Sequence, residues 1–342
     1  MKKGFLGIAL MLLIQVSAQP GGRHAYEFLT LVMSPRVAAM GGELLATPDG
    51  DINVGLWNPS VLTEASTGQL SLNYVNYFDD VNYGQIAYGR KLKNGVLSMG
   101  VKYVNYGTFT EADEFGNILG EFSGSDVALT AGYGMWLDSS WSVGANVKLI
   151  ISAMERYGSV GIAADYAVSW HAKNSDLTAS FIVSNVGLQI TSYSGNREPV
   201  PFELKMAISG KPEHMPLRWH IAAEHLEQIN LTYDDPNANQ TDPLTGDPIN
   251  TEATFGQKVM SHFVIGAELF PESAFNIRAG YNFRRSQEMA IATRRSGAGF
   301  SWGFGLRLKK FRLDYGRATY HVSGASNHFS ISTNLETLLG GI

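Results

Sequence analysis

The sequence predicts an all-β protein: a 14-stranded antiparallel transmembrane β-barrel with an N-terminal hatch, or plug, of short helices in the lumen. Three observations support this prediction. From Thr67 onward, segments of about ten residues alternate apolar and polar side chains, and the connections between them alternate short and long. The composition is also unusual, because only 17% of the 342 residues are charged and 37 are glycine, whereas soluble domains carry roughly 25% charged residues.

The composition also excludes several function classes. The chain has no cysteine, which excludes a disulfide scaffold, a thiolate zinc site and a thiol nucleophile. The formal net charge of −5 provides no basic excess for binding nucleic acid.

The first 18 residues have the order of a secretory signal peptide. Lys2 and Lys3 precede an apolar run, and small residues near Ala18 offer a cleavage site. The apolar run is shorter than the roughly 20 residues of a spanning helix, although a retained anchor is the alternative. We therefore expect three parts: a signal peptide over 1–18, a hatch over 19–66, and an integral outer-membrane barrel over 67–342.

The hatch region does not alternate like the strands. Ser34 is a capping residue before Pro35 at the first helical position, and Gly41-Gly42 is a stop signal, so we expect a helix of about two turns. A disordered leader is the alternative, but the region has many large apolar residues that require burial. The hatch residues singled out are Ser34, Pro35, Arg36, Met40, Gly41, Gly42, Trp57, Asn58 and Pro59.

The alternation predicts fourteen strands. Val160, Ile162 and Ala164 share one face of such a segment, while Asp165 lies on the other. A lysine or arginine facing lipid at mid-depth costs about 2–4 kcal/mol, so the charged face must line the lumen. The expected strands are 67–78, 81–92, 95–107, 124–137, 141–151, 157–171, 176–187, 202–211, 217–225, 259–270, 274–284, 297–309, 311–320 and 326–335.

The connections predict the orientation. Turns such as 93–94 and 138–140 are short, whereas 108–123, 226–258 and 285–296 are long. Bacterial outer-membrane barrels have short periplasmic turns and longer outer loops. Both barrel termini are therefore expected in the periplasm of a Gram-negative cell, with the long loops outside.

Two motifs carry a resemblance to known barrels. The segment 34–42, read together with Trp57-Asn58-Pro59-Ser60, resembles the hatch of FadL-like fatty-acid transporters, although those proteins have Asn-Pro-Ala at the second motif. Within that superfamily the chain resembles the PorV/PorQ family of the type IX secretion system. The stretches that carry this second resemblance are 26–29, 70–77, 279–285, 299–305 and 315–318.

The resemblance implies a non-enzymatic role in the attachment machinery of type IX secretion. A barrel of this kind would hold the surface protein PorZ at the cell exterior, beside the sortase PorU and the barrel PorV, where cargo is joined to lipopolysaccharide. The alternative is a FadL-like channel for long-chain fatty acids or other hydrophobic compounds, which predicts an apolar pocket between hatch and wall.

The residues themselves show no catalytic pattern. His220 and Glu224 are expected on one strand face and His225 on the other, and their spacing fits no zinc-protease motif. The long loops are instead candidate partner-docking sites. Their candidate residues are Asp234, Asp235, Pro236, Asp242 and Asp247, then Glu111, Asp113 and Phe115, and then the basic Arg285, Arg294 and Arg295.

No cofactor is expected. The oxygen-rich loop over 234–247 could bind calcium, but it lacks the EF-hand spacing. A solvated loop in which the Asp-Pro steps form turns is the interpretation we favour.

Overall fold

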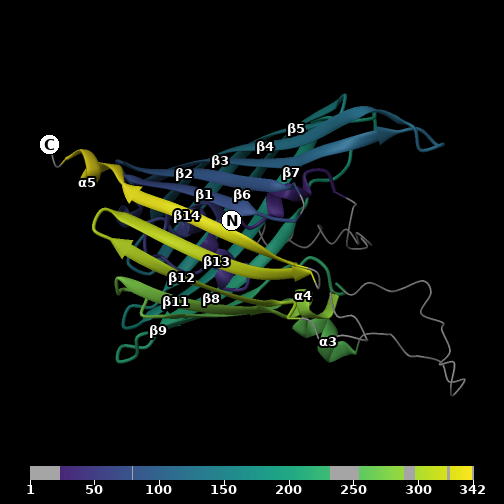
Figure 1. Ribbon diagram of the computed structural model, residues 1–342. Helices are drawn as coiled ribbons and strands as arrows, with labels where there is room; N and C mark the ends of the chain where they lie inside the picture. The colour runs from purple at the N-terminus through teal and green to yellow at the C-terminus, as the bar shows by residue number, and fades with distance from the viewer. Residues whose placement is uncertain (1–23, 79, 232–253, 289–296, 322–323, 341–342) are drawn as a thin grey trace, which may run out of the picture.

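The computed structural model describes residues 24–78, 80–231, 254–288, 297–321 and 324–340. The expected signal peptide over 1–18 lies outside these residues. Within them, fourteen antiparallel strands form one closed barrel in which β1 pairs with both β2 and β14. The strand number and the closed barrel predicted from the alternation are therefore confirmed (Figure 1).

The strand bounds lie mostly within a few residues of those expected. The strands are β1 Gln69–Asn76, β2 Asn82–Leu92, β3 Gly95–Ala112, β4 Ile118–Trp136, β5 Trp141–Met154, β6 Tyr157–His171, β7 Asp176–Thr191, β8 Glu203–Lys211, β9 Leu217–Ala223, β10 Phe263–Leu269, β11 Phe275–Asn282, β12 Phe300–Leu308, β13 Phe311–His321 and β14 Gly324–Asn334.

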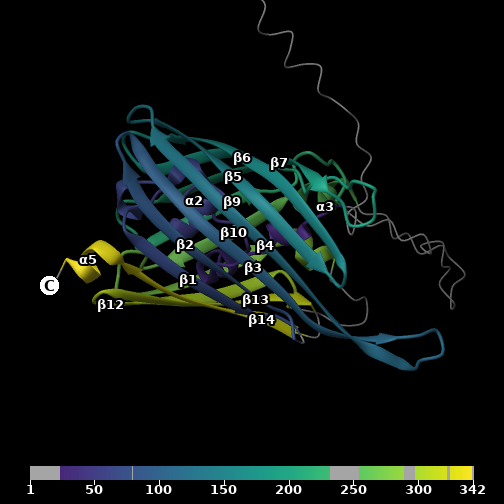
Figure 2. The same cartoon turned by 90° about the horizontal axis from the view of Figure 1, so that it is seen from above.

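The largest difference concerns the segment between the third and fourth strands. Residues 108–123 were expected to form a loop, but β3 and β4 continue through most of it and pair from Thr108↔Ser123 to Ala112↔Ile118. Figure 2 shows this hairpin projecting beyond the rest of the barrel. We call residues 106–123 the arm.

The two faces of the wall differ as the alternation predicts. On β1, Ser71 and Val75 are buried in the lumen, whereas Leu72 and Tyr74 are exposed on the outer surface. The same division holds for the charged positions expected in the lumen, because Asp165, Lys205 and Arg278 are buried there. An apolar outer band with a polar interior is the pattern of an outer-membrane barrel.

The connections at one end of the barrel are all short, as expected, whereas the other end has the long connections together with the two-residue turn between β5 and β6. At the end with only short connections, the strand pairs β2–β3 and β12–β13 are joined by two residues each, and β1 begins and β14 ends there. Helix α5 (Leu335–Leu339) follows β14, while α3 (Phe255–Met260) and α4 (Phe283–Glu288) lie at the opposite end (Figure 1). We call these the periplasmic and outer ends, following the rule for bacterial barrels.

None of the helices in the described ranges is long and apolar enough to cross a membrane.

The hatch fills the lumen with five short elements. They are the 3₁₀ helices η1 Glu27–Thr30, η2 Pro59–Val61 and η3 Glu64–Ser66, and the α-helices α1 Pro35–Ala39 and α2 Ile52–Trp57. The chain passes from the outer end, where Ala25 donates a backbone hydrogen bond to Pro199, to the periplasmic end, where Gly68 bonds to Gly89. Phe28 and Met33 pack against wall residues such as Val104 near the outer end, so the hatch is a packed part of the core.

Candidate functional site: the hatch and the outer end

Helix α1 lies directly on the backbone of three neighbouring strands. Glycines occupy the facing positions, at Gly280 on β11, Gly303 on β12 and Gly316 on β13. A β-carbon at Gly280 would lie 2.1 Å from the Gly41 nitrogen, and one at Gly316 would lie 2.3 Å from the Pro35 carbonyl oxygen. Real β-carbons do not approach other atoms so closely, so only glycine allows this contact. We call these three residues the glycine bed.

The ends of α1 agree in part with the sequence prediction. Pro35 is the first helical residue, but the Ser34 side chain makes no capping hydrogen bond, and the helix ends at Ala39 rather than after two turns. Gly41 and Gly42 have φ values of 96° and 103°, a region that favours glycine. The Gly-Gly stop is therefore confirmed, although the helix spans only five residues.

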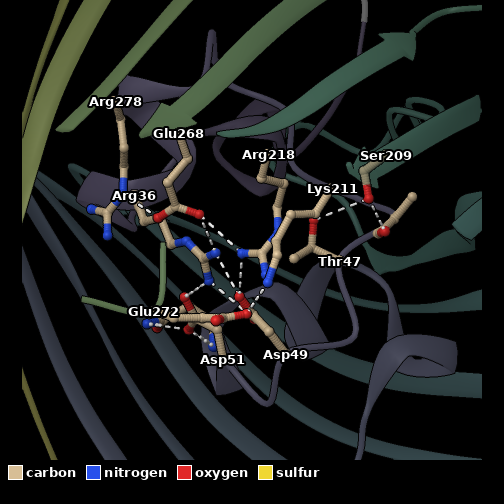
Figure 3. A network of polar contacts seen from close by, with 12 residues as sticks. Arg36, Thr47, Asp49, Asp51, Ser209, Lys211, Arg218, Glu268, Glu272 and Arg278 are labelled. Carbon is tan, nitrogen blue, oxygen red and sulfur yellow. Dashed lines mark hydrogen bonds and ion pairs between the residues drawn. The ribbon is translucent and has the colours of Figure 1, made fainter. Parts of the chain in front are cut away.

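Arg36 makes four charge-assisted hydrogen bonds, three within the hatch to Asp49 and Asp51 and one to Glu268 of the wall (Figure 3). Its Nη2 lies 2.6 Å from Asp49 Oδ2 and 2.8 Å from Glu268 Oε2, and its Nη1 lies 3.1 Å from Asp51 Oδ2. The side chain of Arg36 is only 3% exposed. Since Asp49 and Asp51 belong to the turn before α2, one guanidinium connects α1, α2 and strand β10.

Wall arginines extend this cluster. Arg218 pairs with Asp49 and Glu268, and Arg278 pairs with Glu268 at 2.8 Å. Asp314 accepts hydrogen bonds from Arg278 at 2.7 Å and from Arg312 at 2.9 Å. The resulting network, which we call the lock, has four arginines and four carboxylates and is electrically balanced. Its members are Arg36, Arg218, Arg278 and Arg312 with Asp49, Asp51, Glu268 and Asp314.

The lock holds the carboxylate of the hatch residue Asp49 ionised. Burial alone would raise the pKa of Asp49, but the nearby guanidinium groups of Arg36 and Arg218 outweigh burial and hold that pKa well below its usual range. Asp49 therefore remains a counter-ion for both arginines at neutral pH.

The Trp57 ring lies close to the ammonium groups of two lysines that come from different strands of the wall. Lys102 Nζ on β3 is 4.9 Å from the ring centroid, and Lys205 Nζ on β8 is 5.0 Å from it. Lys102 also donates hydrogen bonds to the carbonyl oxygens of Leu29 and Leu31. The indole is thus a second point of attachment, since cations are attracted to aromatic faces.

The Asn-Pro-Ser motif makes a third attachment. Asn58 Nδ2 donates to the Leu45 carbonyl oxygen, and Asn58 Oδ1 accepts from the backbone and hydroxyl of Ser60. The Ser60 hydroxyl is also 2.6 Å from the Ser169 hydroxyl on β6. An alanine at position 60, as in the FadL-like motif, would lack this bridge to the wall.

A second buried ionic cluster lies nearer the outer end. Lys205 Nζ is 2.7 Å from Glu43 Oε1 and 2.9 Å from Glu203 Oε2, and Glu224 lies beside them. The three carboxylates have the spacing of a metal site, but the Lys205 ammonium already supplies a cation to two of them. Burial raises the pKa of Glu43 to about 7, although the charge of Lys205 opposes this.

His225 does not point away from this cluster, so the expectation for it was wrong. Strand β9 ends at Ala223, and His225 has a φ of 54°, which turns its ring inward. His225 Nε2 is 3.5 Å from Glu203 Oε1, and Nδ1 is 3.1 Å from Glu227. A strand face cannot be extrapolated past the last paired residue, which explains the error.

The arm presents acidic and apolar side chains at the outer end. Phe115 is 82% exposed and Ile118 is 74% exposed. Asp113 closes the tip, because its carboxylate accepts hydrogen bonds from the backbone of Phe115 and Asn117 and from the Asn117 side chain. The Asn117 side chain and these backbone donors lower the pKa of Asp113. Of the predicted docking residues, Glu111, Asp113 and Phe115 therefore lie together.

The other docking residues have different outcomes. Arg285 is not a free loop residue: it lies on α4 with its guanidinium carbon 4.4 Å from the Tyr320 ring centroid, and it contacts Gly42. It packs over the hatch, and its part in docking stays a prediction. The acidic residues Asp234, Asp235, Pro236, Asp242 and Asp247, with the calcium question attached to them, lie outside the described residues, as do Arg294 and Arg295.

Of the comparisons with known proteins, the one with solved structures gives matches, and these agree on the fold. No family model matches the chain, and no curated protein matches it. Among solved structures, the monoaromatic hydrocarbon channel CymD matches with a TM-score of 0.52 at 12% identity, over 88% of this chain and 96% of that one. A deltaS2 mutant of the monoaromatic hydrocarbon channel TodX matches with a TM-score of 0.50 at 13% identity, over 87% and 96%.

This chain shares the barrel fold of these channels. A FadL homologue from Pseudomonas aeruginosa is also similar, with a TM-score of 0.46 and 11% identity over 92% of this chain and 100% of that one. At these identities the likeness concerns architecture: fourteen strands and short N-terminal helices.

Several residues of this barrel that hold the hatch were not predicted from the sequence. Glu268, Arg218 and Asp314 complete the lock, yet they come from three different strands. Their signal in the sequence is a charge on an otherwise small lumenal strand face. Pairing them with the hatch required the strand register.

Proposed function

We propose that this outer-membrane barrel is a sealed docking platform, of the PorQ kind, that holds a surface protein at the outer end. Its partner in this proposal is PorZ, and through it the PorU and PorV attachment machinery of type IX secretion. The observation that carries the proposal is the arm, an acidic hairpin with exposed apolar residues on a barrel whose lumen is filled.

The packing of the lumen supports a platform. The hatch is attached at three separate places: by the lock, by the cation–π contacts of Trp57 with Lys102 and Lys205, and by the hydrogen bond between Ser60 and Ser169. An interior cavity beside Trp57 has a volume of about 30 Å³ and is lined partly by Lys102, Lys148 and Asp165. Benzene occupies an apolar cavity of about 150 Å³ in a protein core, so this space suits a water molecule better than a hydrocarbon.

The arm supports protein docking. Residues 106–123 include four acidic and no basic side chains, and Phe115 and Ile118 are exposed beside them. Exposed apolar groups within a charged surface are typical of interaction sites. The arm therefore fits a partner that combines apolar contacts with basic residues.

The test is surface retention of PorZ in cells that carry Phe115→Ser with Ile118→Ser. We expect correctly inserted barrels, measured by heat-modifiable gel migration, and release of PorZ into the medium, measured by immunoblot. The matched control is Leu339→Ser on α5 at the periplasmic end, where the side chain is also exposed. Full retention of PorZ by the arm variant would remove the arm from the docking surface.

A deletion tests the long loop after β9. Removal of residues 234–256 with barrel insertion retained should likewise release PorZ if that loop contributes to docking. Retention in this deletion together with release by the arm variant would assign docking to the arm.

The second candidate function is a channel for hydrophobic compounds. It is favoured by the fold likeness, because CymD and TodX are described as monoaromatic hydrocarbon channels. In this function the hatch must move, since the space beside Trp57 is small. Saturable uptake of labelled toluene or long-chain fatty acid by proteoliposomes would support the channel, and equal uptake by protein-free liposomes would argue against it.

A further inference from the structure

The turn between β12 and β13 concentrates basic residues at the periplasmic mouth. Arg307 and Arg312 flank the turn, and Lys309 and Lys310 form it, since Leu308 and Phe311 are the last pair of the ladder. Lys309 has a φ of 45°, as two-residue hairpin turns require. All four side chains line one cavity of about 230 Å³ between the hatch and β12–β14.

Two of these residues are placed unfavourably for a strand pair. Arg307 and Arg312 are directly opposite each other in the register, and like charges in that position destabilise a sheet. Arg312 is bonded to Asp314, but Asp314 also receives Arg278. Arg307 therefore lies beside the Arg312 guanidinium, and the one described carboxylate that pairs with Arg312, that of Asp314, also pairs with Arg278.

The lock cannot neutralise the remaining cations. Its four arginines are matched by its own four carboxylates. Arg307, Lys309 and Lys310 form no ion pair with any residue in the described ranges. The cavity lining also holds the carboxylates of Asp49, Asp51 and Asp314, but these are paired with arginines of the lock. The charges of Arg307, Lys309 and Lys310 are therefore left without an ion-pair partner among the described residues.

Besides the basic turn, the cavity is lined by the lock residues Arg36, Asp49, Asp51 and Asp314 and by neutral polar side chains. Ser330, Ser332, Thr333 and Asn334 from β14 line the wall facing the basic turn. In addition, Nη2 of Arg312 is buried and has no hydrogen-bond partner. An unmet guanidinium donor in a polar cavity requires an acceptor, because a buried unpaired donor is costly.

We propose that this cavity binds a phosphate-type oxyanion. Guanidinium and ammonium groups together with hydroxyls are the donors that recognise phosphate oxygens. The oxyanion offsets the repulsion between Arg307 and Arg312 and accepts from the unmet Nη2 of Arg312. Its source is either free phosphate or the headgroup of an anionic phospholipid in the periplasmic leaflet, and the cavity is larger than phosphate alone needs.

The experiment uses the whole mature barrel with two probes. Inorganic phosphate is titrated calorimetrically into the barrel in neutral detergent. In nanodiscs, lipid retention is measured by native mass spectrometry with phosphatidylglycerol compared with phosphatidylcholine. The pocket variant is Arg307→Gln with Lys310→Gln, and the control is Arg90→Gln with Lys173→Gln, which removes the same charge from other exposed positions near the periplasmic turns.

We expect the pocket variant to bind the probe at least about tenfold more weakly, since charge-assisted bonds are lost, while the control binds as the wild type does. A loss in calorimetry assigns free phosphate, and a loss confined to phosphatidylglycerol retention assigns the headgroup. The proposal is overturned if the wild type binds neither probe, or if both variants lose binding equally.

Discussion

The lock predicts that replacing Arg36 releases the hatch without opening the barrel wall. In Arg36→Met, Asp49 keeps Arg218, and Glu268 keeps Arg218 and Arg278, but Asp51 loses its only described cation. Removing one partner of a buried ion pair costs about 3–5 kcal/mol. Because two of the three carboxylates keep a partner, we expect a value near the lower end, about 3 kcal/mol.

The assay is amide hydrogen exchange of the α1 region in the solubilised barrel. The Gly42 amide donates to the Val37 carbonyl oxygen, and the Gly41 amide donates to Ala38 and to the Ser301 hydroxyl of the wall. These amides exchange only when the hatch lifts, so a loss of about 3 kcal/mol should accelerate their exchange roughly a hundredfold. Amides within β12 should keep their protection.

Two further variants provide a control and a test of the geometry of the lock. Arg156→Met removes an arginine that is 75% exposed at the outer end, and it should leave the exchange of Gly41 and Gly42 unchanged. Arg36→Lys keeps the charge but not the two-pronged geometry, so its effect should be intermediate. Wild-type protection of both glycines in Arg36→Met would refute the lock as the main attachment of the hatch.

Three other perturbations test the remaining contacts of the hatch. Gly303→Val should displace α1, because even a β-carbon there would lie 2.8 Å from Ala39 Cβ; loss of α1 protection in a barrel with normal gel migration would show this. Trp57→Leu removes both cation–π contacts and should lower hatch stability by about 1–3 kcal/mol, measured as the urea midpoint for exchange of hatch amides, and an unchanged midpoint would contradict it. The pKa of Glu43 is raised to about 7 from 4.5, so the stability that protonated Glu43 adds to the hatch is fully present below about pH 4.5 and is lost as the pH rises through 7. Glu43→Gln should abolish this part of the pH dependence of the hatch protection factors. A pH profile unaltered by Glu43→Gln would exclude Glu43 as its source.

The sequence was informative wherever a single strand determines the outcome. The alternation in 157–171 gave the bounds of β6 without error, because buried and lipid-facing positions alternate strictly there. The arm was missed because Glu111, Asp113 and Glu114 interrupt the apolar pattern outside the membrane. Beyond the lipid, pairing of β3 with β4 no longer needs an apolar face.

The candidate site was predictable in its residues but not in its contacts. Arg36 and Trp57 were singled out from local motifs, and both attach the hatch. Their partners Glu268 and Lys205 lie more than a hundred residues away, and only barrel closure brings them together. Arg285 illustrates the converse, since its charge suggested an exposed loop while its position over Tyr320 follows from packing.

The glycine bed has a consequence for how the hatch can move. The hatch main chain lies against Gly280 and Gly316, and the Ala39 methyl group lies against Gly303, so no flexible side chain lies between hatch and wall to adjust by rotamer changes. A packed interface of this kind has discrete arrangements rather than a continuum. The plug should therefore be seated or unseated as one unit, so any passage through this barrel would switch on abruptly instead of widening by degrees.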